Sequence, residues 1–148
     1  MRAWAEIDLD AIAHNFKEIK RVTSPDAKIM AVIKADAYGH GFTEVAHTLL
    51  QSGAHAFAVA TADEALQLRR AGFDVPVLIL GYVFVDEYEE LIKNGISLVA
   101  GSLDTAREIS CAAKKAGKRA KIHIKLDTGM GRIGFVCGDD DESVADEI

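Results

Sequence analysis

Lys34 is the side chain whose place in this sequence points most directly to chemistry. It ends the apolar run KIMAVIK, and the segment ADAYGHG follows at once, with Tyr38, His40 and two glycines. Parallel β/α proteins gather their active-site residues at the carboxyl ends of strands. A lysine in a partly dry site there can form a Schiff base with a carbonyl group. The alternative is a surface lysine whose ammonium group reaches solvent.

A second group of polar residues lies in KIHIKLDTGMGRIG, residues 121–134. As a single strand, this run places Lys121, His123, Lys125 and Asp127 on one face and the apolar residues on the other. The simplest interpretation is an amphipathic strand with one face exposed to solvent. In a barrel, helices would cover the apolar face and the polar side chains would point inward. Arg132 follows on a glycine-flanked loop, where a guanidinium could bind a carboxylate in two places.

The letters GMGRIG, residues 129–134, also fit the GxGxxG pattern of dinucleotide-binding sites. That fingerprint requires the glycines to open a helix. FVCGDDD follows instead, which is a poor helix start. A nucleotide-dependent oxidoreductase is therefore a rival hypothesis that depends on this match alone.

The elements that must position these residues alternate between short apolar runs and amphipathic segments. We expect strands at residues 28–34, 56–60, 75–80, 97–100 and 120–126, the middle three buried on both faces. Gly53, Gly72, Gly95 and Gly117 each follow an expected helix, as helix-ending glycines do. Leu9, Ile12, Phe16 and Ile19 share one face of the first helix. Thr61 with Glu64 fits a capping box, and Ser102 fits an N-cap.

Alternating strands and helices are typical of a doubly wound sheet or a β/α barrel. Five strands are expected here, whereas a closed barrel has eight over about 250 residues. If the fold is a barrel, residues 1–148 form one partial barrel domain, incomplete in this chain, and an open sheet edge is exposed unless something pairs with it.

Composition excludes several classes of function. The chain has 148 residues, 49% of them apolar, and a net charge of −6, which argues against binding to nucleic acid. No apolar run is long enough to span a membrane, and acids interrupt the N-terminal stretch where a signal peptide is apolar. We expect a cytoplasmic protein. Cys111 and Cys137 form no metal-type spacing, so we expect two reduced thiols and no metal site.

AVIKADAYGHG resembles the pyridoxal-phosphate attachment segment of bacterial alanine racemases. FAVATADEALQLRRAG, VPVLILG and IKLDTGMGRIGF extend the resemblance along the chain, which corresponds to under half of such an enzyme. It implies a TIM-type (β/α)8 barrel of which this chain is the N-terminal portion, with about five β/α units. It also implies that the C-terminal part of the barrel and a β-rich C-terminal domain lie outside this chain.

The resemblance also implies roles for individual residues. Lys34 would form the internal aldimine with pyridoxal 5'-phosphate and act as one of two bases that move the α-proton. Tyr38 matches a tyrosine that bonds the cofactor phosphate, and Arg132 matches the arginine that contacts the substrate carboxylate. Lys125 matches a lysine often found carbamylated in the family. No role is assigned to His40.

The implied function of the parent enzyme is racemisation of L-alanine to D-alanine, which supplies peptidoglycan synthesis. The family completes each site from two subunits, so the resemblance implies a homodimer whose second base, a tyrosine, lies outside this chain. We therefore expect these 148 residues alone to have little or no activity. The alternatives are a racemase for serine or a broader range of amino acids, and a non-catalytic cofactor-binding or scaffold fragment.

Overall fold

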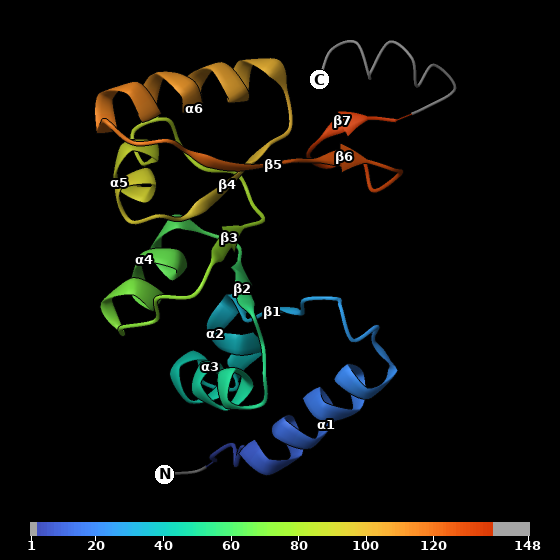
Figure 1. Cartoon of the computed structure of the whole chain (residues 1–148). Coiled ribbons are helices and arrows are strands. Elements are labelled where there is room, and N and C mark those ends of the chain that lie inside the picture. Colours follow the sequence, from blue (N-terminus) through green and yellow to red (C-terminus); the bar gives the residue numbers. More distant parts are fainter. Residues whose placement is uncertain (1–2, 138–148) are drawn as a thin grey trace.

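The computed structural model describes residues 3–137, in which helices alternate with short strands (Figure 1). The helices are α1 (Leu9–Val22), α2 (Lys34–Gly39), α3 (Phe42–Gln51), α4 (Ala62–Arg70), α5 (Tyr88–Lys93) and α6 (Leu103–Ala116). The strands are β1 (Met30–Val32), β2 (Ala56–Val59), β3 (Val77–Ile79), β4 (Ser97–Ala100), β5 (Lys121–Ile124), β6 (Leu126–Asp127) and β7 (Phe135–Val136). None of the helices in this part of the chain has the length and apolar character needed to cross a membrane.

Five strands form one parallel sheet in the order β1-β2-β3-β4-β5. Sequential strands are spatial neighbours, and a helix connects each to the next. This is the arrangement of consecutive β/α units in part of a β/α barrel, as the sequence predicted. All five carboxyl ends lie at the same end of the sheet, so the loops that follow the strands share one edge.

The core lies between the sheet and its helices. In Figure 1, α4 and α5 lie to the left of the strands, α6 lies above β5, and α1 lies at the lower right. Phe57, Val77, Ile79 and Leu98 from the inner strands are buried against this helical layer. The other face of β2 and β3 is buried too. Ala58 and Leu78, which are neighbours on that face, are 1% and 6% exposed. The expectation that the middle strands are covered on both faces is therefore confirmed.

The helix ends follow the sequence signals. Thr61 and Glu64 form the predicted capping box at the start of α4. Ser102 caps α6 by accepting the N–H of Thr105 at 3.2 Å. The glycines that follow α3, α4, α5 and α6 all have positive φ, between 63° and 102°. A glycine adopts this conformation without the steric cost of a Cβ atom, which is why it ends these helices.

The predicted strand at residues 120–126 is wrong in its extent. β5 ends at Ile124, and Leu126 and Asp127 belong to β6, which pairs with β7 instead of the main sheet. The break falls at Lys125, whose N–H donates to Ala100 O at 2.9 Å while its own carbonyl accepts the N–H of Phe135 at 2.9 Å. The alternating pattern continues through both strands, so it does not reveal that the chain changes partners.

The sheet is not closed within residues 3–137, and β1 and β5 are its two edges. Apolar side chains at these edges stay about half exposed: Val32 by 42%, Ile122 by 47% and Ile124 by 49%. Ile19 was predicted to lie on the same face of α1 as Phe16, which is buried. It is 54% exposed, because it lines an open groove beside the edge strand β1.

Candidate active site

Lys34 lies two residues after the end of β1 and opens α2, at the end of the sheet that the sequence predicted. It is half-buried, and the preceding Ile33 is buried. Its Nζ atom lies 6.0 Å from the ring centroid of Tyr38, within the range where a cation is attracted to an aromatic face. The amine and the phenol therefore border the same space beyond the strand end.

A left-handed turn follows β1, and the sequence did not predict it. Within α2, residues Ala35, Asp36, Ala37 and Tyr38 have φ values of 52°, 55°, 52° and 57°. A non-glycine residue in this conformation costs roughly 1–2 kcal/mol, because its Cβ atom crowds the following carbonyl oxygen. One turn of such a helix brings Tyr38 back over Lys34, which explains how the two side chains meet.

Side chains of the motif hold this turn in place. The Asp36 carboxylate accepts the N–H of Phe42 at 2.8 Å, which joins the turn to the first residue of α3. The ring Nδ1 of His40 lies 2.8 Å from Ala37 O. Ala37 is 4% exposed, so the turn is also packed into the core. His40 therefore supports the loop.

Asp127 organises the loop that carries Arg132. Its carboxylate accepts the backbone N–H groups of Gly129 at 3.0 Å, Gly131 at 2.9 Å and Arg132 at 2.7 Å. The N–H donors of Gly131, Gly129 and Arg132 stabilise the ionised form and lower the pKa of Asp127 to about 2. The sequence placed Asp127 on the polar face of a strand and missed this role. An aspartate shortly before Gly129 and Gly131 is the signal that could have revealed it.

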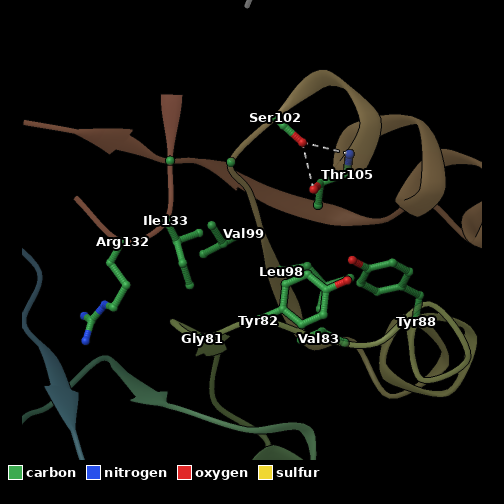
Figure 2. A pocket seen from close by; sticks show the side chains of 12 residues that line it. Gly81, Tyr82, Val83, Tyr88, Leu98, Val99, Ser102, Thr105, Arg132 and Ile133 are labelled. Atoms are coloured by element: carbon green, nitrogen blue, oxygen red, sulfur yellow. Dashed lines mark hydrogen bonds between the residues drawn. The ribbon is translucent and has the colours of Figure 1, made fainter. Parts of the chain in front are cut away.

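Arg132 lines a cavity of about 270 Å³ between the ends of β3 and β4 and the 129–134 loop. In Figure 2 its guanidinium points away from Ser102 and Tyr88, which lie on the other side of that cavity. Tyr88 is 2% exposed, and the pKa of its phenol is raised, first by burial and then by the negative charge of Glu108. Sequence reasoning gave Tyr88 no role, and its burial is explained by core packing.

Close backbone contact fixes the Arg132 loop against the sheet. A Cβ atom on Gly101, just after β4, would lie 3.1 Å from Gly134 N. A Cβ atom on Gly134 would lie 2.8 Å from Lys125 O and 2.9 Å from Asp127 N. A Cβ atom at Gly134 would clash with backbone atoms, and one at Gly101 would be tightly crowded, so glycine at both positions suits the close approach of the loop. Gly134 leads into β7 and not into a helix, which removes the structural basis for a dinucleotide site.

The predicted site residues lie at one end of the sheet but on different edges. Lys34 and Tyr38 follow β1, whereas Lys125 and Arg132 follow β5. Within the part of the chain that the structure describes, no hydrogen bond or ion pair joins the two pairs. Lys125 is half-buried, and its backbone marks the change from β5 to β6.

Both cysteines are free thiols, as predicted, with Cys111 exposed and Cys137 half-buried. Residues 3–137 contain no group of three or more histidine, cysteine, aspartate or glutamate side chains able to hold a metal ion. The predicted site residues offer an amine at Lys34, a phenol at Tyr38 and a guanidinium at Arg132.

Five parallel strands in sequential order, each joined to the next through a helix, are consistent with part of a β/α barrel, and Lys34 follows the first of these strands. A family model described as alanine racemase, N-terminal domain, matches residues 7–148. The chain belongs to that family.

Individual relatives support the assignment. The chain is 52% identical over 133 residues to an alanine racemase from Methanococcus maripaludis, covering 90% of this chain and 36% of that protein. It is 47% identical over 143 residues to an alanine racemase from Desulforamulus reducens, covering 97% and 38%. The chain thus spans little more than a third of the length of these relatives.

Solved structures share the fold. An alanine racemase from Clostridium difficile 630 matches with a TM-score of 0.89 and 43% identity, covering 97% of this chain and 38% of that one. A histidine racemase from Leuconostoc mesenteroides matches with a TM-score of 0.84 and 32% identity, covering 96% and 38%.

Proposed function

We propose that this chain supplies the amine-bearing part of the active site of a pyridoxal-phosphate-dependent alanine racemase. The observation that carries the proposal is Lys34, half-buried at the carboxyl end of β1 with its Nζ atom beside the ring of Tyr38. A chain of the alanine racemase family with a lysine in this place has the nucleophile that an aldehyde cofactor requires.

The residues of the site fit part of such a cofactor. Lys34 offers an amine to the aldehyde, and Tyr38, 61% exposed, has a hydroxyl available to a phosphate oxygen. Gly39 and Gly41 have φ values of 85° and 86°, and because they carry no side chain they leave the loop beside the site uncrowded. When bound, pyridoxal phosphate makes the α-hydrogen of an amino acid acidic by delocalising the charge left on the α-carbon.

Each residue then has a task of its own. Lys34 would hold the cofactor through Nζ and, once that atom is released, would accept or return the α-proton on one face. Arg132 pairs with a carboxylate through its guanidinium. Asp127 fixes the backbone from which Arg132 extends. A carbamylated Lys125 would add a negative charge near that loop, which is the modification we propose for it.

We further propose that racemisation requires groups beyond these 148 residues. The relatives are more than twice as long as this chain, which leaves room for the rest of a barrel and a β-rich domain. A proton must be delivered to the opposite face by a second base, and we propose that a second subunit of a homodimer provides it. Residues 1–148 would then be one partial barrel domain with little or no activity alone.

A second candidate function is racemisation of another amino acid. The structural similarity to a histidine racemase, with a TM-score of 0.84, supports this second candidate, because that protein shares the fold of this region. Assays with alanine, serine and histidine, on a protein of the relatives' length that contains this sequence, distinguish the substrates. We expect alanine to be preferred.

Covalent labelling tests the role of Lys34. The chain is incubated with pyridoxal phosphate, reduced with borohydride, digested and analysed by mass spectrometry. We expect the added mass on Lys34, and none there in Lys34→Arg. Lys28 is exposed near the other end of β1, so Lys28→Arg is the matched control and should leave the labelling of Lys34 unchanged. Equal labelling of Lys28 and Lys34 in a folded sample would contradict the proposal.

A further inference from the structure

We propose that Glu64 is a positioning residue for Lys34, because its carboxylate ties the backbone after β1 to the backbone after β2. Glu64 Oε1 accepts the N–H of Ala35 at 2.7 Å, and Oε2 accepts the N–H of Ala60 at 2.7 Å and that of Thr61 at 3.2 Å. The inference rests on the proposed role of Lys34 and concerns how its amine is held.

The carboxylate does more than cap its own helix. A capping box needs only the reciprocal bonds between Thr61 and Glu64, and both are present. The bond to Ala35 reaches a residue 29 positions earlier, on a different strand-to-helix connection. It is also as short as the bond to Ala60. Hydrogen bonds to an ionised acceptor are shorter and stronger than neutral ones, so this bridge is a firm link between the two connections.

The backbone at Ala35 has particular need of such a link. Ala35 is the first of the four left-handed residues, and β1 is paired on one side only within residues 3–137. On that side, Ile33 donates its N–H to Ala58 O at 3.0 Å, and this is the last such bond before Lys34. Glu64 supplies the next anchor, immediately after Lys34. The backbone is therefore held by hydrogen bonds on both sides of Lys34, which sets the direction in which its side chain leaves the chain.

The other end of the bridge is rigid. Ala60 follows β2 directly, and its carbonyl packs against Gly81 so closely that a Cβ atom there would lie 2.3 Å from the oxygen. Its N–H is held by Glu64. Because Ala60 cannot shift easily, the carboxylate that binds both Ala60 and Ala35 holds the backbone after β1 in place relative to β2.

Glu64→Gln breaks this bridge with little change in size. The carboxamide has one acceptor oxygen, so one of its two ends presents an N–H2 group to a backbone donor. We expect amide hydrogen exchange at Ala35 or Ala60, followed by NMR, to accelerate at least about tenfold, the factor that corresponds to losing a hydrogen bond to a charged group. We expect the affinity for pyridoxal phosphate at Lys34, measured from its absorption, to weaken by a similar factor of about ten.

Two controls separate positioning from general stability. Thr61→Ala removes the other half of the same capping box but leaves the bond to Ala35 in place. Asp63→Asn removes a neighbouring exposed charge in the first turn of α4. We expect both to retain slow exchange at Ala35 and the cofactor affinity of the unaltered chain. Glu64→Asp keeps the charge but is one methylene too short for the bridge, and it should behave as Glu64→Gln does.

The outcomes distinguish this inference from the proposed function. Unchanged exchange at Ala35 and Ala60 in both Glu64 variants overturns the inference, and so does an equal loss of cofactor affinity in Thr61→Ala. If the unaltered chain does not bind pyridoxal phosphate at Lys34, the proposed function fails. The exchange measurement then decides alone whether Glu64 holds the turn after β1.

Discussion

Replacing Ala35 by glycine should stabilise the chain, although a glycine usually weakens a helix. Ala35 has φ 52°, and a non-glycine residue there costs roughly 1–2 kcal/mol. Glycine removes that cost but adds about 0.5–1 kcal/mol of backbone entropy to the unfolded state. Ala35 is exposed and its bond to Glu64 comes from the backbone, so neither burial nor the hydrogen bond is lost. The net gain lies between about 0 and 1.5 kcal/mol, with a central value of about 0.75 kcal/mol.

Urea unfolding followed by circular dichroism measures this difference, and thermal unfolding should show a rise in Tm of about 1–4 °C. The matched control is Ala13→Gly, in the middle of the right-handed helix α1. That substitution should destabilise by about 1 kcal/mol, so the same chemical change has opposite signs at the two positions. If Ala35→Gly lowers the midpoint as much as Ala13→Gly does, the left-handed turn does not exist in solution.

Two further predictions concern the loop that carries Arg132. The pKa of Asp127 is about 2 in the folded chain, below its ordinary value of 3.8. The ionised carboxylate therefore stabilises the fold above about pH 4, and this contribution is lost as the pH falls toward 2. Asp127→Asn should lower the urea midpoint at neutral pH and flatten its dependence between pH 4 and 2; an unchanged acid slope would contradict this. Gly134→Ala should destabilise more than Gly72→Ala in the same measurement. Both glycines have positive φ, but a Cβ atom at Gly134 would lie 2.8 Å from Lys125 O, whereas one at Gly72 would have nothing within 4 Å. Equal losses of stability in the two variants would refute the close packing of the loop that carries Arg132.

Much of the fold could be predicted from local patterns, because each one records a local preference of the backbone. The apolar runs of β2, β3 and β4 are buried where the sequence placed them. Thr61 caps α4, and Gly117 ends α6 in the left-handed conformation. The lysine at the end of β1 was also visible, since an apolar run that stops at Lys34 marks a strand end.

The details of the candidate site depended on contacts between distant residues. No sequence pattern indicates that the carboxylate of Glu64 reaches Ala35 or that alanines there adopt positive φ. The alternation through residues 121–127 likewise hid the break at Lys125, where the chain leaves β4 to pair with β7.

The sequence by itself determined the order of the main strands and helices, the caps of α4 and α6, and that Lys34 follows the first strand. Only the tertiary structure decided how that lysine is held and how the loop of Arg132 is shaped. The physical reason is that periodicity and capping act within one segment. The bonds of Glu64 and the close approach of Gly101 to Gly134 exist only after folding brings separate connections together at one end of the sheet.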